Sequence, residues 1–449
     1  MRVVNAYWMS PDDVPGIARR DFVKAAVAIG GANALTACLS REGATEDSEF
    51  PRGPGDLSAL PDRQHAWGRF IVHDAHDNTV LPQHQLLLFL NYRGSGTPTD
   101  ADRERVEETL RTLERAYQRG TAGDISASIN PGLLFTLGYS RDYFDRFDAD
   151  LPADLDLQRP ETVLEAVGED PEKADHYDAL LVLTADFGSI LLAVEEALFG
   201  DRDRMNGVPM PTSFDEVFEK ADRRAGVVGK GLPAQEVDVD AIPEHAPLSM
   251  GFKSGFKDSL PAEDRVTIES GPFAGGTTQA VSRLLIDVER WYDNDRDSRV
   301  HGMFSPHHDV DDVGETGEPL GNDSGITEEM TTDEAIAEGA ERTGCVGHTA
   351  KTARARDENF EPRILRRSEA VATDLVEDGK VGFNFTSVQR GVEDFVKTRK
   401  AMNPDEYDVD VDDPHHGIVD YLTVVSRATF LLPPRRLRSL PSPNPEPES

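Results

Sequence analysis

The order of apolar segments repeats along this chain, and the repetition restricts the fold more than any other feature of the sequence. In each half, short apolar runs suited to buried strands alternate with stretches whose apolar residues recur at helical spacing. Elements in this order form sheets with helices packed on one face. The sequence therefore predicts an α+β fold of two similar halves, with antiparallel sheets. The strand-like runs are 85–91, 133–137, 179–184, 277–288, 381–388 and 418–432, and the helical stretches are 106–117, 141–147, 189–199 and 392–400.

Changes in composition divide the chain further. A Pro- and Gly-containing acidic connector separates the two halves, and the end of the chain is rich in Pro and Ser, which favours disorder. The length that remains after the N-terminal segments is too great for one small core. The predicted parts are a signal at 1–40, a tether at 41–61, an N-terminal domain at 62–235, a C-terminal domain at 245–434 and a disordered tail at 435–449. The C-terminal domain carries an acidic insertion at 301–340, expected to be a surface loop with, at most, one helix near 332–341.

The first forty residues have the order of an export signal. Arg19 and Arg20 precede an apolar stretch at 25–34, which is much shorter than the ~20 residues needed to span a bilayer. Leu-Thr-Ala-Cys at 35–38 closes the stretch and resembles a lipobox. We therefore expect export through the twin-arginine route and a lipid on Cys38 that holds the protein at the extracellular face of the membrane. Because this route exports folded proteins, a cofactor inserted before export is expected.

The charge of the chain excludes one class of partner. Its 83 acidic and 47 basic residues give a net charge of -36, spread over the whole length. Such a surface repels nucleic-acid phosphates, so we expect no DNA or RNA partner. A uniformly acidic chain is typical of proteins adapted to very high salt, where screening weakens the repulsion between like charges.

Short catalytic motifs give little guidance. The sequence contains no phosphate-binding loop, dinucleotide glycine fingerprint, zinc-protease motif or nucleophile elbow. Two histidine pairs, His307–His308 and His415–His416, stand beside several aspartates. We interpret both as parts of solvated acidic loops, because acids are abundant throughout the chain.

A series of short segments in the second half is more specific. His348 is followed by Ile-Leu-Arg-Arg-Ser at 364–368, Val-Gly-Phe-Asn-Phe at 381–385, Val-Gln-Arg-Gly at 388–391, Gly-Ile-Val-Asp-Tyr at 417–421 and Phe-Leu-Leu-Pro-Pro at 430–434. The first half contributes Gln-His-Ala-Trp-Gly at 64–68, Leu-Phe-Thr-Leu-Gly-Tyr at 134–139 and Phe-Asp-Arg-Phe at 144–147. In this order the segments resemble the dye-decolourising haem peroxidases, a family built from two ferredoxin-like domains of the dimeric α+β barrel type.

The resemblance implies haem as the cofactor and assigns roles to four residues. His348 would be the axial ligand to the haem iron, and Asp420 would accept a hydrogen bond from its other ring nitrogen. Arg366 would lie on the opposite face of the haem and stabilise charge as peroxide splits, with Ser368 in support. Neighbouring residues of an extended segment point in opposite directions, so Arg367 is the alternative to Arg366.

The distal acid of the family can be matched in two frames. The family's Gly-x-x-Asp-Gly corresponds either to residues 255–259, where Asp258 keeps the carboxylate, or to residues 251–255, where Ser254 replaces it. We choose Asp258, because a carboxylate can move the proton of peroxide between its oxygens. In the other frame Arg366 acts without a distal carboxylate.

The predicted function is therefore a haem peroxidase that reduces hydrogen peroxide and oxidises an unidentified external donor. One alternative is an exported haem carrier of the same fold without turnover. A second alternative is a ligand-binding surface protein that keeps the fold but binds no haem. The sequence leaves the oligomeric state open.

Overall fold

A computed structural model describes residues 50–200, 202–228, 247–377, 379–409 and 415–445 of the chain. The predicted twin-arginine signal, the lipobox with Cys38 and most of the tether lie outside the described residues.

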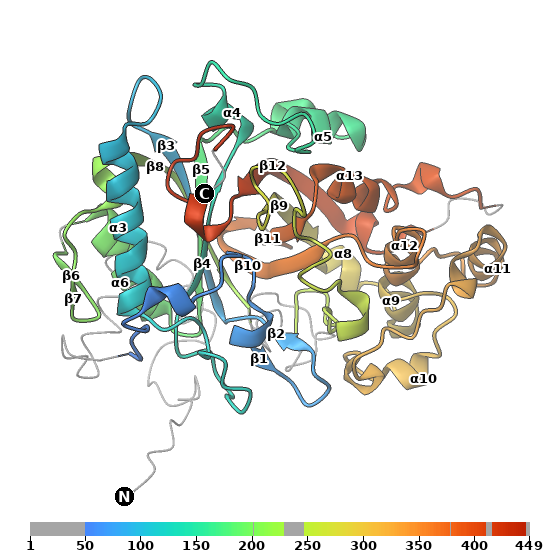
Figure 1. Cartoon of the computed structure of the whole chain (residues 1–449). Helices are drawn as coiled ribbons and strands as arrows, with labels where there is room; N and C mark the ends of the chain where they lie inside the picture. The colour runs from blue at the N-terminus through green and yellow to red at the C-terminus, as the bar shows by residue number, and fades with distance from the viewer. Residues whose placement is uncertain (1–49, 201, 229–246, 378, 410–414, 446–449) are drawn as a thin grey trace, which may run out of the picture.

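Eight antiparallel strands close into a barrel, and each half of the chain supplies four of them (Figure 1). Around the barrel the strand order is β10-β11-β9-β12-β4-β5-β3-β8. The strands are β3 (His84–Tyr92), β4 (Leu134–Tyr139), β5 (Ala179–Ala185), β8 (Phe218–Val227), β9 (Thr277–Asp287), β10 (Leu365–Glu377), β11 (Lys380–Gln389) and β12 (Leu422–Leu432).

The two halves have the same strand order. In each half the fourth strand pairs with the first, the first with the third and the third with the second, which is the order of a ferredoxin-like βαββαβ unit. Pairing of β8 with β10 and of β12 with β4 joins the halves. The predicted α+β fold of two ferredoxin-like halves with antiparallel sheets is therefore confirmed.

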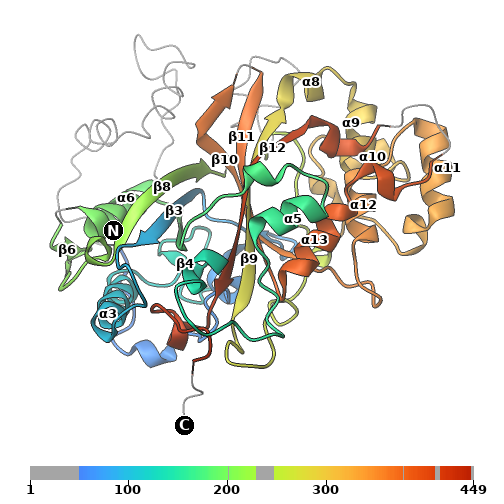
Figure 2. The same cartoon turned by 90° about the horizontal axis from the view of Figure 1, so that it is seen from above.

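Helices cover the outer faces of both sheets (Figure 2). In the first half the helices are α3 (Asp100–Ala116), α4 (Arg141–Phe144), α5 (Pro160–Ala166) and α6 (Gly188–Phe199). In the second half they are α8 (Val288–Tyr292), α9 (Arg296–Met303), α10 (Val310–Val313), α11 (Asp333–Thr343), α12 (His348–Arg354) and α13 (Val392–Lys400). Helix α3 begins where Thr99 and Asp102 form a reciprocal capping box, which satisfies two backbone amides that the helix leaves without partners. Among the described residues, none of the helices combines the length and apolar character needed to cross a membrane.

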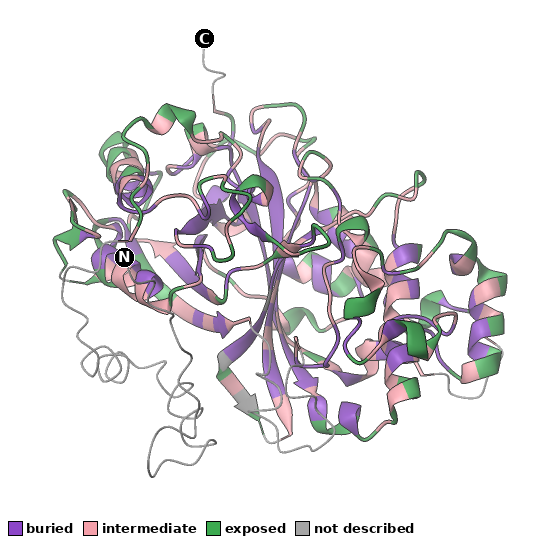
Figure 3. Ribbon diagram, turned by 90° about the horizontal axis from the view of Figure 1, so that it is seen from below, coloured by how far each residue is buried: buried purple, intermediate pink, exposed green. Residues whose placement is uncertain are grey.

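The inside of the barrel is one buried cluster made by both halves (Figure 3). Leu87 and Phe89 of β3 meet Val281 of β9 and Phe430 of β12 there. Because side chains alternate along a strand, the neighbouring residues of these strands point outward, towards the helices. The outward residues of the C-terminal sheet form one wall of the candidate site.

Three sequence-based expectations differ from the structure. Residues 301–340 were expected to be a surface loop with, at most, one helix near 332–341. The structure has α11 at that place, but it adds α10, and Val313 and Ile336 are buried because apolar residues of these helices pack inward. The last strand was expected to begin at residue 418, but residues 417–421 form a 3-10 helix, and β12 starts at Leu422.

The third expectation was a disordered tail, and this is wrong for residues 435–445. Arg438 is 1% exposed, and its guanidinium bonds the carboxylates of Glu107 and Glu114 on α3. The hydroxyl of Tyr139 donates to the Arg438 carbonyl, and Leu440 is fully buried. Composition pointed to disorder, but ion pairs with α3 hold these residues in place.

Candidate functional site

A cavity of about 290 Å³ lies between the outer face of the C-terminal sheet and the surrounding helices. This volume is near the lower end of the range for small-molecule sites. The sheet wall is apolar, and the facing wall is formed by α12 and the segment around residues 248–260. The residues of the sheet wall include Leu284 and Ile286 of β9, Phe383 and Phe385 of β11, and Leu422 and Val424 of β12.

His348 lies on this cavity as the first residue of α12. The preceding Gly347 allows the close approach, because a Cβ there would lie 2.2 Å from the carbonyl oxygen of Phe304. Burial, with the nearby charges of Arg366 and Lys351, lowers the pKa of His348 to about 3. The imidazole is therefore neutral at physiological pH. Its Nδ1 is buried without a hydrogen-bond partner, which leaves Nε2 as the nitrogen able to serve the cavity.

Arg366 and Arg367 of β10 point in opposite directions. Arg366 lines the cavity, and its charge is one of those that depress the pKa of His348. The side chain of Arg367 is buried, with Nη2 donating to the carbonyl oxygen of His65 and to the carboxylate of Glu263. The structure thus places Arg366, and not Arg367, beside His348.

Ser368 lies away from the cavity. An irregularity in the pairing of β10 with β11 falls between Arg366 and Ser368, so the two residues do not share a face. The Ser368 hydroxyl donates to Oε1 of Gln85, 2.5 Å away on β3. The structure does not bring Ser368 to Arg366 for the supporting role that the resemblance implied.

Asp420 lies near His348 in the fold without bonding it. Its carboxylate accepts a hydrogen bond from the backbone amide of His416 at 2.7 Å, and its Oδ2 is 3.6 Å from Nδ1 of His415. Nδ1 of His348 has no partner, so the expected Asp420–His348 hydrogen bond is not formed. The turn of 3-10 helix at 417–421 directs the carboxylate towards the 415–416 backbone instead.

The two candidate residues for the distal acid, Asp258 and Ser254, differ in whether they line the cavity. Asp258 is exposed and does not line the cavity, and its backbone carbonyl accepts a hydrogen bond from Arg356. Ser254 lines the cavity, together with Ser259. Of the two candidates, Ser254 lines the cavity and Asp258 does not.

Among the described residues that line the cavity, every charged side chain is basic. His348 lines the cavity as a neutral group. Four of these cations have acidic partners: Arg399 and Arg427 share Glu169, Arg363 pairs with Asp394, and Lys253 pairs with Asp74. The basic residues of the wall are Lys253, Arg356, Arg363, Arg366, Arg399 and Arg427. In a chain with 83 acidic residues, this wall is suited to an apolar ligand that carries negative groups.

Sequence reasoning missed Lys351, which lies three residues after His348 and so on the same face of α12. Lys351 is 0% exposed, and its ammonium donates to the carbonyl oxygens of Met402 and His416 at 3.0 and 3.1 Å. Burial lowers the pKa of Lys351 to about 8. Its spacing from His348 was visible in the sequence, but its burial depends on the 3-10 helix at 417–421 and on the end of α13.

The cavity fits a haem group better than a bare metal ion. No group of three or more acidic, cysteine or histidine ligands occurs in the part of the chain that the structure describes. A neutral, buried imidazole is a protein ligand that haem iron takes. The apolar sheet wall suits the ring, and the cations suit its carboxylates. Ser249 and Ser259, on the wall that faces the sheet, add buried hydroxyls without hydrogen-bond partners.

The model of a family of unknown function (DUF7405) matches residues 82–434. A comparison with curated proteins finds no match.

Several solved structures are similar at low identity. A dye-decolorizing protein from V. cholerae is 14% identical with a TM-score of 0.49, and the match covers 83% of this chain and 98% of that one. DypB of Rhodococcus jostii, solved in complex with heme, is 14% identical with a TM-score of 0.48, covering 83% and 97%. A dye-decolorizing peroxidase of Bacteroides thetaiotaomicron is 13% identical with a TM-score of 0.45, covering 83% and 98%. Likenesses this distant carry no information about the ligand or the reaction of this chain.

Proposed function

The chain belongs to the DUF7405 family of unknown function, and we propose that it is a haem-dependent peroxidase. In this proposal it reduces hydrogen peroxide and oxidises an external electron donor. The observation that carries the proposal is the pairing of a neutral, buried His348 with Arg366 on one apolar cavity. When bound, haem would supply an iron able to exchange electrons with peroxide and with the donor.

The residues of the cavity would bind the haem and stabilise charge during the reaction. His348 would hold the iron through Nε2, and the basic residues of the wall would bind the carboxylates of the ring. Arg366 offers a fixed positive charge beside the cavity, and such a charge stabilises negative charge that develops on oxygen. Asp258 is outside this cavity, so Arg366 would act without the carboxylate expected there.

The proposal is tested by the absorption spectrum of protein produced with haem available. We expect a Soret band in the parent protein and loss of stoichiometric haem binding in His348→Ala, because this change removes the imidazole that the described residues place on the cavity. His84→Ala is the control, since His84 is a partly buried histidine in the other half. A parent protein without a Soret band contradicts the proposal, as does His348→Ala that binds haem as tightly as the parent.

A haem carrier without useful turnover is the second candidate. It is favoured by the positions of Asp258 and Asp420, because neither carboxylate bonds a group on the cavity. Peroxide-dependent oxidation of a donor dye by haem-loaded protein decides between the two. The peroxidase proposal requires turnover in the parent and a loss of roughly a hundredfold or more in Arg366→Met, the usual size for removing one charge-stabilising donor. A haem-loaded parent protein that oxidises the dye no faster than free haem would favour the carrier, and equal turnover in the parent and Arg366→Met would remove Arg366 from the catalytic role.

We also propose that the protein is exported by the twin-arginine route and anchored through a lipid on Cys38. The support is the order of Arg19, Arg20, the short apolar stretch and Cys38 in the sequence. Replacing both arginines by lysine should keep the protein in the cytoplasm, and Cys38→Ser should release it from the membrane fraction. Unchanged fractionation of either variant contradicts the corresponding part.

A further inference from the structure

We infer that one face of the N-terminal half lies against the lipid bilayer that holds the protein. The inference rests on the proposed lipid anchor at Cys38, and it adds the surface of the folded part that meets the same membrane. This apolar face consists of four side chains, Val80, Ile125, Ile129 and Phe187.

The first support is the exposure of these side chains. Among the described residues, these four are the large apolar side chains that are exposed to solvent, and Ile125 is 97% exposed. A single exposed apolar side chain is ordinary. Several on one surface mark a contact with another molecule or with a membrane, so it matters whether the four lie together.

The hairpin and the loop that carry three of these side chains are bonded to each other. The hairpin consists of β1 (Val72–His73) and β2 (Thr79–Val80). Val80 pairs with Val72, whose backbone amide donates to Oδ1 of Asn130. Asn130 directly follows Ile129 and ends the loop that contains Ile125. The hairpin and this loop reach the same edge of the molecule (Figure 1).

Asp186 joins Phe187, the next residue, to the same surface. Its two carboxylate oxygens accept hydrogen bonds from the backbone amides of Asn130 and Gln83, at 2.6 and 3.0 Å. Because both oxygens already have protein donors, this carboxylate loses less when water is removed from the surface. The segments that carry the four apolar side chains are thus linked by hydrogen bonds into one surface.

The second support is the composition of the loop at 120–132. Charged residues make up 29% of the sequence, but Asp124 is the one charged residue of this loop. The Asp124 carboxylate accepts hydrogen bonds from the backbone amide and the hydroxyl of Ser126. An exposed loop with isoleucines and little charge suits the boundary between lipid headgroups and acyl chains, where apolar side chains gain and charges lose free energy.

The third support is the place where the chain enters the fold. The ring of Phe50, the first described residue, lies 5.3 Å from the ring of Phe187 on the apolar face. The backbone amide of Phe50 donates to Oδ1 of Asn206, and its carbonyl oxygen accepts from Nδ2 of the same side chain. These bonds fix the entry point beside the apolar face.

The chain between the proposed anchor and this entry point is short. Residues 39–49 join Cys38 to Phe50, and a segment of this length spans at most about 40 Å when fully extended. A compact fold of about 400 residues has a diameter of about 55 Å. With the lipid of Cys38 in a bilayer, such a link cannot span the molecule, so the side that carries Phe50 and the apolar face stays towards the membrane.

A fluorescent label that reports the polarity of its surroundings, NBD, tests the inference on the full lipidated chain. The label is attached at Ile125→Cys, and the protein is reconstituted with phosphatidylcholine vesicles. We expect blue-shifted emission and quenching by lipids that carry a nitroxide near the headgroup. Glu165→Cys is the control, because Glu165 is exposed on α5, at the opposite edge of the molecule, and its label should keep the emission seen in water (Figure 1). The parent protein, treated in the same way, reports any labelling of the native cysteines.

Variants test whether apolar area drives the contact. A label at Ile129→Cys should be quenched like the one at Ile125→Cys. Adding Ile125→Ser should reduce this quenching, since burying an isoleucine side chain is worth about tenfold to a hundredfold in an equilibrium constant. Adding Ile125→Leu keeps the apolar area and should leave the quenching unchanged. Because the Ile125 side chain is exposed, neither change disturbs the core. Equal quenching with Ile125→Ser overturns the inference.

Flotation with the vesicles separates this inference from the proposed anchor. Parent protein that floats, while the label at Ile125→Cys keeps the emission seen in water, overturns the inference and leaves the anchor intact. Parent protein that does not float overturns both. A blue shift that appears without vesicles and grows with protein concentration also overturns the inference, since it shows that a second copy of the chain covers the apolar face.

Discussion

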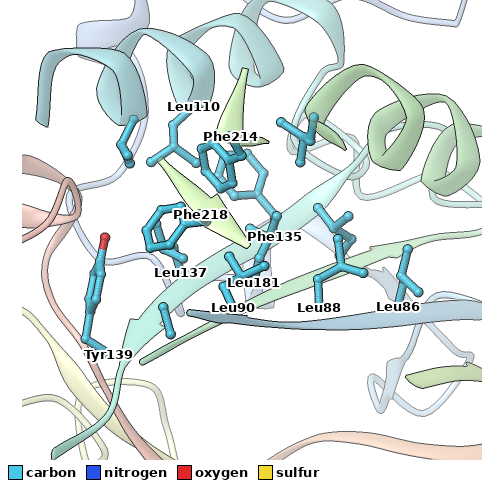
Figure 4. Close-up of a cluster of buried hydrophobic side chains, with 14 of the residues drawn as sticks. Leu86, Leu88, Leu90, Leu110, Phe135, Leu137, Tyr139, Leu181, Phe214 and Phe218 are labelled. Carbon is cyan, nitrogen blue, oxygen red and sulfur yellow. The ribbon is translucent and has the colours of Figure 1, made fainter. Parts of the chain in front are cut away.

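The two halves of the barrel share a strand order but use the outer face of their sheets differently. In the N-terminal half, the outward residues Leu86, Leu88 and Leu90 of β3 are buried beneath α3 and α6 in a continuous apolar cluster (Figure 4). In the C-terminal half, the outward residues Leu284 and Ile286 of the equivalent strand β9 face the cavity. The outer face of the N-terminal sheet is therefore covered by packed side chains, whereas the outer face of the C-terminal sheet borders a cavity.

The connections between strands explain the difference. The first crossover of the N-terminal half is one helix, α3, of 17 residues, whose face with Val106, Leu110 and Leu113 is fully buried. The corresponding crossover of the C-terminal half is divided into five shorter helices, α8 to α12. Short helices cannot lay one continuous apolar stripe along a sheet. Because this connection is divided into short helices, it leaves a cavity over the outer face of the C-terminal sheet, and α12 places His348 on that cavity.

The largest predicted effect concerns the buried charges that close the N-terminal half. Glu114 is 6% exposed and bonds both Arg435 and Arg438. Replacing Glu114 by Gln leaves buried guanidinium groups short of a counter-charge, so we expect a loss of about 3–5 kcal/mol in the free energy of unfolding, measured with urea. The control is Glu108→Gln, since the Glu108–Arg115 pair is exposed and should be worth less than about 1 kcal/mol. Equal losses in the two variants would show that the tail does not close this half.

The ion pairs of Glu114 with Arg435 and Arg438 also predict that the free energy of unfolding depends on pH. Hydrogen bonds and charge from Arg435 and Arg438 hold the pKa of Glu114 at about 2, against 4.5 for the free side chain. Because the pKa is lowered in the folded state, the stabilisation is complete above pH 4.5 and is lost as the pH falls towards 2. Stability curves of the parent and Glu114→Gln should therefore converge on acidification. Parallel curves would contradict the assignment.

The barrel was predictable because its strands carry local signals. The runs at 85–91, 179–184 and 381–388 are apolar and short, and the structure has β3, β5 and β11 there. The ordered tail was not predictable, because its order comes from the pairing of Arg438 with Glu107 and Glu114, which lie far away in sequence. Composition alone does not report such long-range pairs.

The candidate site was predictable in part for a similar reason. Strand alternation limited the choice to Arg366 or Arg367 but could not decide which of them faces the site, and the register of β10 decides it. The carboxylates were harder to place, because Asp258 and Asp420 lie in short 3-10 turns whose direction no periodic pattern encodes. Even on the regular strand β10, the irregularity between Arg366 and Ser368 moved Ser368 off the face that strict alternation predicts.

The next prediction compares equivalent leucines of the two sheets. Leu88 is fully buried in the N-terminal cluster, whereas Leu284 is 8% exposed and borders the cavity. Leu88→Ala should cost about 2–5 kcal/mol in the free energy of unfolding, since it opens a cavity in a packed core. Leu284→Ala should cost clearly less in protein without haem, because that side chain already lacks neighbours on one side. Equal losses in urea unfolding would mean that the two sheets are packed alike.

The smallest predicted effect concerns Lys351, a buried cation of the C-terminal half. Arg438 in the other half is paired with carboxylates, whereas the ammonium of Lys351 is bound by the carbonyls of Met402 and His416. Burial lowers its pKa from 10.5 to about 8, so between these values the unfolded chain binds more protons than the folded one. Stability contributed by this group therefore rises with pH across that window, by on the order of 3 kcal/mol.

Lys351→Met removes the titrating group and should abolish this rise. We would measure urea unfolding of both proteins without haem at several pH values across the window, and compare the slopes and not the absolute stabilities, because the substitution also leaves two carbonyls without a donor. Lys220→Met is the matched control, since Lys220 is paired with Glu195 near the surface of the other half. A parent slope that persists in Lys351→Met would show that the C-terminal half accommodates its buried charge as well as the N-terminal half does, and would remove that contrast between them.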